Sequence, residues 1–305
     1  MAFIDQQLII ATLQLTTPIA LAAIGASFCE RTGVVNIAME GLLLFGAFAA
    51  AATSWYIGPW IGVLVAILAG MLLSAIFAIL CIHYEANQIV VGVAINLFAL
   101  GFTTTMLRVI WKRTGAGDPV PKIKDLSIPT LKELPVIGFL GRLNPLIYIT
   151  LLVVPAAYFL MFKTPLGLRI RAAGEHPRAL DTAGVNVYKI RYIGVLISGA
   201  LCGLGGAYLS IGHLNLFTKN MTTGRGFIAL AANIFGKWNP LYVFLASLFF
   251  GFTDALQIRV QQMTEIAGAS YFIQMIPFIL TIAVLAGAVR RAIPPAAIGQ
   301  PYQKD

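Results

Sequence analysis

The sequence contains few charged residues. Asp, Glu, Lys and Arg make up 11% of its 305 residues, whereas apolar side chains make up 59%. In an average soluble domain about a quarter of the residues are charged. The mean hydropathy of +0.85 points the same way. The composition therefore excludes an ordinary soluble domain and predicts a membrane protein.

Nucleotide-binding and catalytic motifs are also absent. There is no glycine-rich loop that ends in Lys followed by Ser or Thr, so the chain cannot bind ATP by that route. The three histidines, His83, His176 and His213, form no H-E-x-x-H, and no G-x-S-x-G is present. The sequence therefore disfavours an intramembrane enzyme, and we expect a chain that is not an enzyme.

Cysteine is scarce, and the excess of positive charge is spread over the loops. Cys29, Cys81 and Cys202 lie in or beside apolar runs without metal-ligand spacing, so we expect small buried side chains and no metal. The net charge of +9 is not gathered in one patch. In a membrane protein this distribution reports topology, and we expect no nucleic-acid partner.

Long apolar runs dominate the rest of the chain. Runs of about 20 residues match the thickness of the hydrocarbon core. The candidate spans lie near 8–28, 37–56, 61–82, 87–110, 143–162, 192–212, 222–236, 241–258 and 271–289. The span at 222–236 is short enough for a half-helix or re-entrant element. The sequence predicts an all-α polytopic membrane protein, a single domain over 1–305 with roughly nine to ten transmembrane helices.

The distribution of Lys and Arg predicts the orientation. Residues 163–191 contain six Lys and Arg against Glu175 and Asp181, which favours the cytoplasmic side. Counting spans from there places the C-terminus in the cytoplasm and residues 111–142 outside. That second loop is also rich in Lys and Arg, which conflicts with the rule. An extracytoplasmic loop that contacts another protein could bear such charges.

A short helix is predicted inside the 163–191 segment. Pro177 suits a first helical turn and Gly184 suits the residue just past a helix end. An isolated helix of about two turns is marginal in water, so something must hold it. Two interpretations are open: a solvated loop held by its own chain, or an element that docks into a cytoplasmic partner.

Three stretches resemble segments of one family. "AAGEHPRALDTAGVNV" (172–187) resembles the coupling loop of ABC importer permeases, in the branch for branched-chain amino acids, ribose-type sugars and nucleosides. "GVVNIAMEGLLLFGAFAA" (33–50) and "GRGFIALAANIFGKWNPL" (224–241) are similar to two further segments of that family. The likeness is greatest to the nucleoside permeases that depend on a basic membrane lipoprotein, and within them to the shorter of two paired permeases.

The resemblance implies a function and a set of partners. Such a permease encloses the solute path in the cell membrane, and its cytoplasmic helix fits a groove on a separate ATPase subunit that binds the ATP. A second permease subunit, giving a heterodimer, and an extracytoplasmic solute-binding lipoprotein complete the importer. The coupling positions would be Gly174, Glu175, His176, Pro177, Arg178, Asp181, Ala183 and Gly184.

Polar residues inside the predicted spans are candidates for the solute path. They are Asn36, Glu40, Gln88, Asn96 and Asn233. Each could instead be structural, because polar groups in a membrane need partners. We expect Asn36 and Glu40 to share one helix face, and Gln88 and Asn96 another. For Glu40 the structural alternatives are backbone donors or a pair with Arg31.

Other features leave further alternatives open. Gly199 and Gly203 have the GxxxG spacing, which favours packing within the subunit over a dimer face. The order of motifs in 32–60 and 223–240 is similar, as in an inverted repeat. Branched-chain amino acids or ribose-type sugars are alternative solutes. A stand-alone secondary transporter is a third possibility, but it would need coupling carboxylates deep in the spans.

Overall fold

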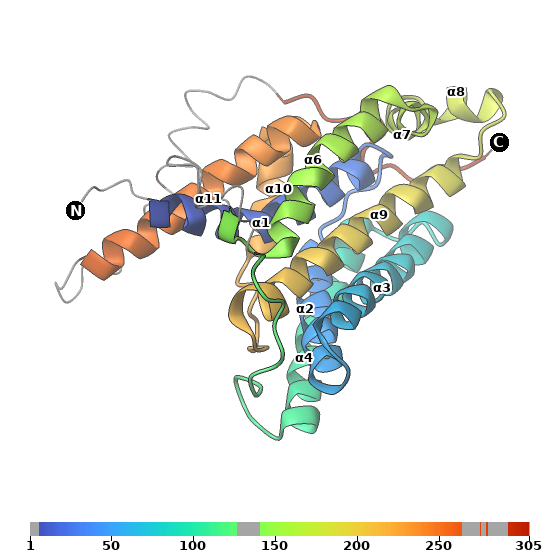
Figure 1. The fold of residues 1–305 in the computed structure, drawn as a ribbon. Helices are drawn as coiled ribbons and strands as arrows, with labels where there is room; N and C mark the ends of the chain where they lie inside the picture. Colours follow the sequence, from blue (N-terminus) through green and yellow to red (C-terminus); the bar gives the residue numbers. More distant parts are fainter. Residues whose placement is uncertain (1–5, 127–140, 264–274, 276–278, 280–291, 305) are drawn as a thin grey trace.

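The computed structural model describes residues 6–126, 141–263, 275, 279 and 292–304, and most of these residues are in helices (Figure 1). Their one isolated β-bridge joins Ala116 and Thr218. Six described helices are long and apolar enough to cross a membrane. They are α1 (Gln6–Glu30), α3 (Pro59–Ala78) continued by η1 (Ile79–His83), α4 (Gln88–Trp111), α6 (Pro145–Lys163), α9 (Val187–Ala207) continued by η3 (Tyr208–Leu214), and α11 (Pro240–Met263). The prediction of an all-α polytopic membrane protein is confirmed.

Two of the predicted spans are shorter helices. The span predicted at 37–56 is α2 (Met39–Tyr56), and most of its residues are buried. The span predicted at 222–236 is α10 (Arg225–Phe235), which has 11 residues. At 1.5 Å per residue α10 is roughly 17 Å long, about half of the hydrocarbon thickness, so it has the length of a half-helix. The span predicted at 271–289 lies outside the described residues, apart from Met275 and Ile279.

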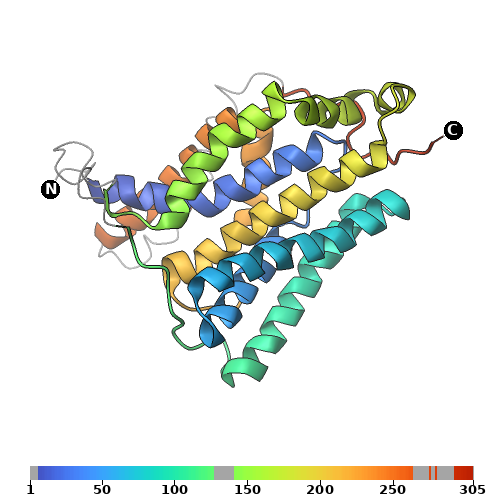
Figure 2. The same cartoon turned by 45° about the vertical axis from the view of Figure 1, so that its right-hand side comes forward.

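Helix α9 lies at the centre of the described bundle (Figures 1 and 2). It packs against α1, α2 and α3, while α1 also packs against α10 and α11. Two short helices, α7 (Pro165–Glu175) and α8 (Pro177–Thr182), lie at the end of the bundle where α9 begins. This end is called the α8 end below. An inverted repeat stays a prediction.

Glycines allow the close packing of α2, α3 and α9. A Cβ atom on Gly46 would lie 2.7 Å from the Cα atom of Gly203, and one on Gly199 would lie 2.5 Å from the carbonyl oxygen of Gly70. A Cβ atom on Gly203 would overlap the carbonyl oxygen of Ala66. The two glycines of the GxxxG pair therefore pack within the subunit, as predicted.

Gly203→Ala tests this packing. The added methyl group would press on the α3 backbone, and overpacking of this kind costs about 1–3 kcal/mol. We expect a lower midpoint of thermal unfolding in detergent, measured by light scattering and tryptophan fluorescence. Gly101→Ala is the matched control, because Gly101 is also helical but has open space around it. Equal midpoints for the two variants would contradict the packing assignment.

Candidate functional site

The segment at the α8 end has the predicted helix boundaries. Pro177 is in the first turn of α8, and the helix ends at Thr182. Gly184 has φ of +80°, and its N–H donates to the carbonyl of Asp181 at 2.8 Å. This left-handed conformation favours glycine because other residues are strained by their Cβ. The prediction of a short helix between Pro177 and Gly184 is confirmed.

Helix α8 has one buried side chain, which packs on the bundle. Leu180 is 7% exposed and belongs to the main hydrophobic core. The residues around it form the exposed α8 face, which consists of His176, Arg178, Ala179, Thr182, Ala183 and Gly184. The short side chains of Ala179, Thr182 and Ala183, with Gly184, allow another protein to approach this face closely. A helix anchored on one side and exposed on the other is suited to contact with another protein.

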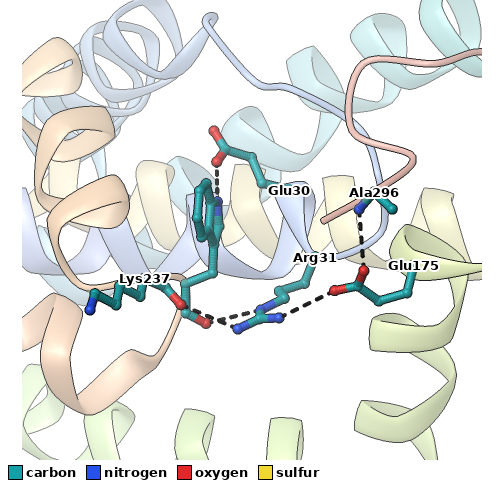
Figure 3. A network of polar contacts seen from close by, with 6 residues as sticks. Glu30, Arg31, Glu175, Lys237 and Ala296 are labelled. Carbon is teal, nitrogen blue, oxygen red and sulfur yellow. Dashed lines mark hydrogen bonds and ion pairs between the residues drawn. The ribbon is translucent and has the colours of Figure 1, made fainter. Parts of the chain in front are cut away.

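The C-terminal end of α7 contacts the end of α1. Gly174 is buried, and a Cβ atom there would overlap the carbonyl oxygen of Arg31. The carboxylate of Glu175 lies 3.9 Å from the Arg31 guanidinium and accepts the N–H of Ala296 at 3.2 Å (Figure 3). Burial lowers the pKa of Arg31 from its ordinary value, and Glu175 acts in the opposite direction.

The end of α1 also holds the turn between α10 and α11. The Arg31 side chain donates to the carbonyls of Lys237 at 3.2 Å and Trp238 at 3.3 Å (Figure 3). Glu30 accepts the indole N–H of Trp238 and, at 2.9 Å, the amide of Asn233. Asn233, a candidate for the solute path, is thus buried and bonded to Glu30. Sequence reasoning missed Glu30.

Residues 31–38, called the α1–α2 break, connect two helices without forming one. The expectation that Asn36 and Glu40 share a helix face is wrong, because α2 begins only at Met39. The Asn36 side chain accepts the N–H of Ala38 at 3.0 Å and donates to Ser198 at 3.0 Å. An Asn that bonds to its own backbone two residues on favours a turn over a helix.

Helix α4 supplies partners for the α1–α2 break and for the start of α2. Gln88 accepts the N–H of Val35 at 2.7 Å. Asn96 accepts the N–H of Gly41 at 2.7 Å and donates to the carbonyl of Ile37 at 2.9 Å. Both side chains lie on one face of α4, as predicted, and both satisfy backbone groups that have no helical partner.

Glu40 joins the N-terminal ends of α2 and α10. Its two carboxylate oxygens accept the N–H groups of Gly224 at 2.8 Å and Gly226 at 2.7 Å. A negative charge is favourable at a helix N-terminus, where backbone N–H groups are unpaired. The backbone-donor alternative for Glu40 is therefore confirmed, and the alternative pair with Arg31 is wrong because Arg31 contacts Glu175.

All five candidates for the solute path thus have partners within the chain. This favours the structural interpretation of each, and a role in lining the path stays a prediction. Among the residues that the structure describes, no group of His, Cys, Asp or Glu could hold a metal ion.

A further segment at the α8 end was not anticipated from the sequence. Residues 292–304, called the tail segment, run beside α7 and α8. A hollow of about 730 Å³ separates part of the tail segment from α8 and is lined by residues of both, including His176, Arg178, Gln300 and Tyr302. No motif in the tail segment predicts this position.

Comparison with known proteins identifies the family. Residues 8–285 match the model of the branched-chain amino acid transport system permease component. The chain belongs to this permease family. No solved structure matches the permease.

Three relatives resemble the permease over nearly their full length. The guanosine ABC transporter permease protein NupQ of Bacillus subtilis is 43% identical over 96% of this chain and 95% of its own. The nucleoside ABC transporter permease protein NupC of Lactococcus lactis is 38% identical, with 98% of each chain covered. The putative glucose ABC transporter permease protein TsgC13 of Haloferax volcanii is 34% identical, with 97% of each covered. These relatives are transport proteins, not enzymes.

Glu40→Gln tests the structural interpretation of the buried carboxylate. The new NH₂ group would face one of the two N–H groups that Glu40 now accepts, and an unsatisfied buried donor costs about 1–3 kcal/mol. We expect a lower midpoint of thermal unfolding in detergent. Asp118→Asn is the control, because it removes the charge of a surface pair with the exposed Arg113, and such pairs are worth about 0–1 kcal/mol. Unchanged stability with altered solute affinity would instead assign Glu40 to the solute path.

Proposed function

We propose that this permease is the transmembrane subunit of an ATP-driven ABC importer for nucleosides. The observation that carries the proposal is the exposed α8 face, which belongs to a two-turn element outside the spans whose one buried side chain is Leu180. The similarity to guanosine and nucleoside permease proteins supports the solute class. Branched-chain amino acids and sugars are the alternative solutes. The similarity to the putative glucose permease protein of Haloferax volcanii supports a sugar as an alternative.

In this proposal the α8 end is cytoplasmic. The positive charge of residues 163–191 supports this orientation, which also places the tail segment in the cytoplasm and residues 111–142 outside. An ABC ATPase subunit then binds the exposed α8 face, which holds the coupling positions His176, Arg178, Ala183 and Gly184. Gly174 is buried against the Arg31 carbonyl and lies outside this face. ATP is bound by that subunit, since the chain has no phosphate-binding loop.

The proposed importer contains two further proteins. A second permease subunit would pair with this one to enclose the path, which fits the many large apolar side chains exposed on α3 and α4, such as Leu68, Leu72 and Phe98. Lipid would cover the apolar surface that the second permease leaves free. A solute-binding lipoprotein would deliver the nucleoside to the extracytoplasmic end.

The network in Figure 3 suggests how ATPase movement reaches the membrane interior. Displacement of α8 moves Glu175, which contacts Arg31 at the end of α1. Arg31 and Glu30 hold the turn between α10 and α11, and α10 meets Glu40 at its other end. A movement of α7 and α8 would therefore shift α10, a half-helix, without unfolding a span.

A stand-alone secondary transporter is less well supported. Such a protein would need carboxylates that release and bind a coupling ion. Among the residues that the structure describes, Glu30 and Glu40 are the buried carboxylates, and both are bonded to Trp238, Asn233 or backbone N–H groups. The exposed α8 face would also have no role in that function.

Arg178→Glu tests the docking role of α8. Arg178 is exposed, so the reversal should leave the fold intact while it repels the ATPase subunit or misaligns it. We expect loss of nucleoside uptake and of stimulated ATP hydrolysis in reconstituted vesicles. Lys189→Glu is the matched control, because Lys189 is also exposed in the same basic segment but lies outside α8. Normal uptake by Arg178→Glu would refute the docking role.

The solute class is tested separately. Uptake of labelled guanosine by cells that express the complete transporter should be competed by other nucleosides and by neither leucine nor ribose nor glucose. Binding of the same compounds to the partner lipoprotein, measured by calorimetry, gives an independent readout. Competition by leucine or a sugar alone would overturn the nucleoside assignment while leaving the importer assignment standing.

A further inference from the structure

The tail segment forms hydrogen bonds to two separate elements, α7 and the α1–α2 break. Ala297 donates its N–H to the carbonyl of Gly174 at 2.8 Å, and Gly299 donates to the carbonyl of Gly33 at 2.9 Å. Gly174 lies in α7, next to the coupling helix, and Gly33 lies in the α1–α2 break. Two N–H donors that are two residues apart in the tail segment thus join α7 to the α1–α2 break.

Buried Arg191 anchors the tail segment to α9. Its side chain is 1% exposed, donates to the carbonyl of Gln300 at 3.0 Å and lies 6.0 Å from the ring centroid of Tyr302. Its Nε and one Nη are buried without a hydrogen-bond partner among the described residues. A buried cation with few partners is costly unless those it has are retained. Burial of Arg191 and docking of the tail segment therefore depend on each other.

The outer contacts of the tail segment are weaker. Lys304 lies 3.7 Å from Asp181 of α8, with 65% of the lysine side chain exposed. Gln303 donates to Glu85 at 2.7 Å, also on the surface. Exposed pairs of this kind contribute little. The inner contacts are those at Gly174, Gly33 and Arg191, together with the Tyr188 hydroxyl, which donates to the carbonyl of Tyr302 at 3.1 Å. These contacts determine where the tail segment lies.

Without the tail segment, the direct polar and steric contacts between α7 and the break would act mainly in one direction, although Ile170 and Ala173 also hold α7 in the core. The close contact of Gly174 with the Arg31 carbonyl opposes approach but not separation. The Arg31–Glu175 pair is 3.9 Å long, and 45% of the Glu175 side chain is exposed, so it opposes separation weakly. The hydrogen bonds from Ala297 and Gly299 oppose separation directly.

We propose that the tail segment is a strap, positioned by Arg191, that transmits displacement of α7 and α8 to the α1–α2 break. The proposal rests on the function proposed above. The strap makes the coupling segment and the break move as one body in both directions. Arg191 is a positioning residue, since it acts through the tail segment.

Arg191→Met and deletion of residues 295–305 test the strap in the complete transporter, reconstituted with its ATPase and lipoprotein. We expect nucleoside uptake and lipoprotein-stimulated ATP hydrolysis to fall about tenfold or more, within the usual range of coupling between sites. ATPase co-purification and unstimulated hydrolysis should stay near the wild-type values. Arg191→Lys should retain most of the uptake because lysine can still donate to Gln300. Arg169→Met, an exposed change on α7, is the matched control.

A purely structural role for Arg191 predicts a different result. Replacement of buried charges by apolar residues of similar volume is often neutral for stability. A merely structural arginine would therefore leave coupled transport unchanged in Arg191→Met. Transport within twofold of wild type in both test variants overturns the strap. Loss of the ATPase subunit from the complex also overturns it, because the tail segment would then be part of the surface that binds the ATPase. Failure of the wild-type chain to bind an ATPase would instead overturn the proposed function.

Hydrogen exchange on the wild-type complex is a test that needs no variant. The amides of Ala297 and Gly299 should be protected both without nucleotide and with ADP and vanadate trapped in the ATPase, since a strap stays docked while it moves. Loss of protection in the vanadate-trapped state would show that the tail segment is released, and would overturn the proposal.

Discussion

The need to satisfy backbone hydrogen bonds away from water governs this structure. A helix satisfies its own N–H and C=O groups, but each interruption leaves several without partners. The α1–α2 break and the start of α10 are two such interruptions within the bundle. Gln88 and Asn96 supply the partners at the first, and Glu40 supplies them at the second. These three side chains are thus placed beside helix ends.

This requirement links parts of the chain that are distant in sequence. Glu40 begins α2 but bonds to the start of α10, and Glu30 ends α1 but bonds to Asn233 near the end of α10. Both ends of the half-helix are therefore held by carboxylates from the first two helices. The α8 end joins the same system through Glu175 and Arg31. One continuous set of polar contacts runs from the surface to the interior.

Sequence reasoning worked where a residue type acts locally and failed where its partner is remote. Pro177 and Gly184 mark the two ends of α8. They could be recognised in the sequence because the fixed ring of proline and the left-handed φ of glycine are properties of single residues. The prediction that Asn36 and Glu40 share a helix face was wrong. The apolar pattern of the sequence continues through the α1–α2 break, which Asn36 stabilises as a turn. The partners of Glu30 and Arg191 were not predictable, because Asn233 and Gln300 are more than a hundred residues away.

The two kinds of contact in the bundle differ in how they respond to force. Gly46, Gly70 and Gly203 let the backbones of α2, α3 and α9 touch, and any shift along these helices would drive the next side chain into a carbonyl. Such packing has one arrangement and behaves as a rigid body. At the helix breaks the contacts are hydrogen bonds between single groups rather than closely packed backbones. Motion driven from the α8 end would therefore be absorbed by α10 and the α1–α2 break, while the helices packed around Gly203, about 18 Å along α9 from Arg191, provide the frame against which they move.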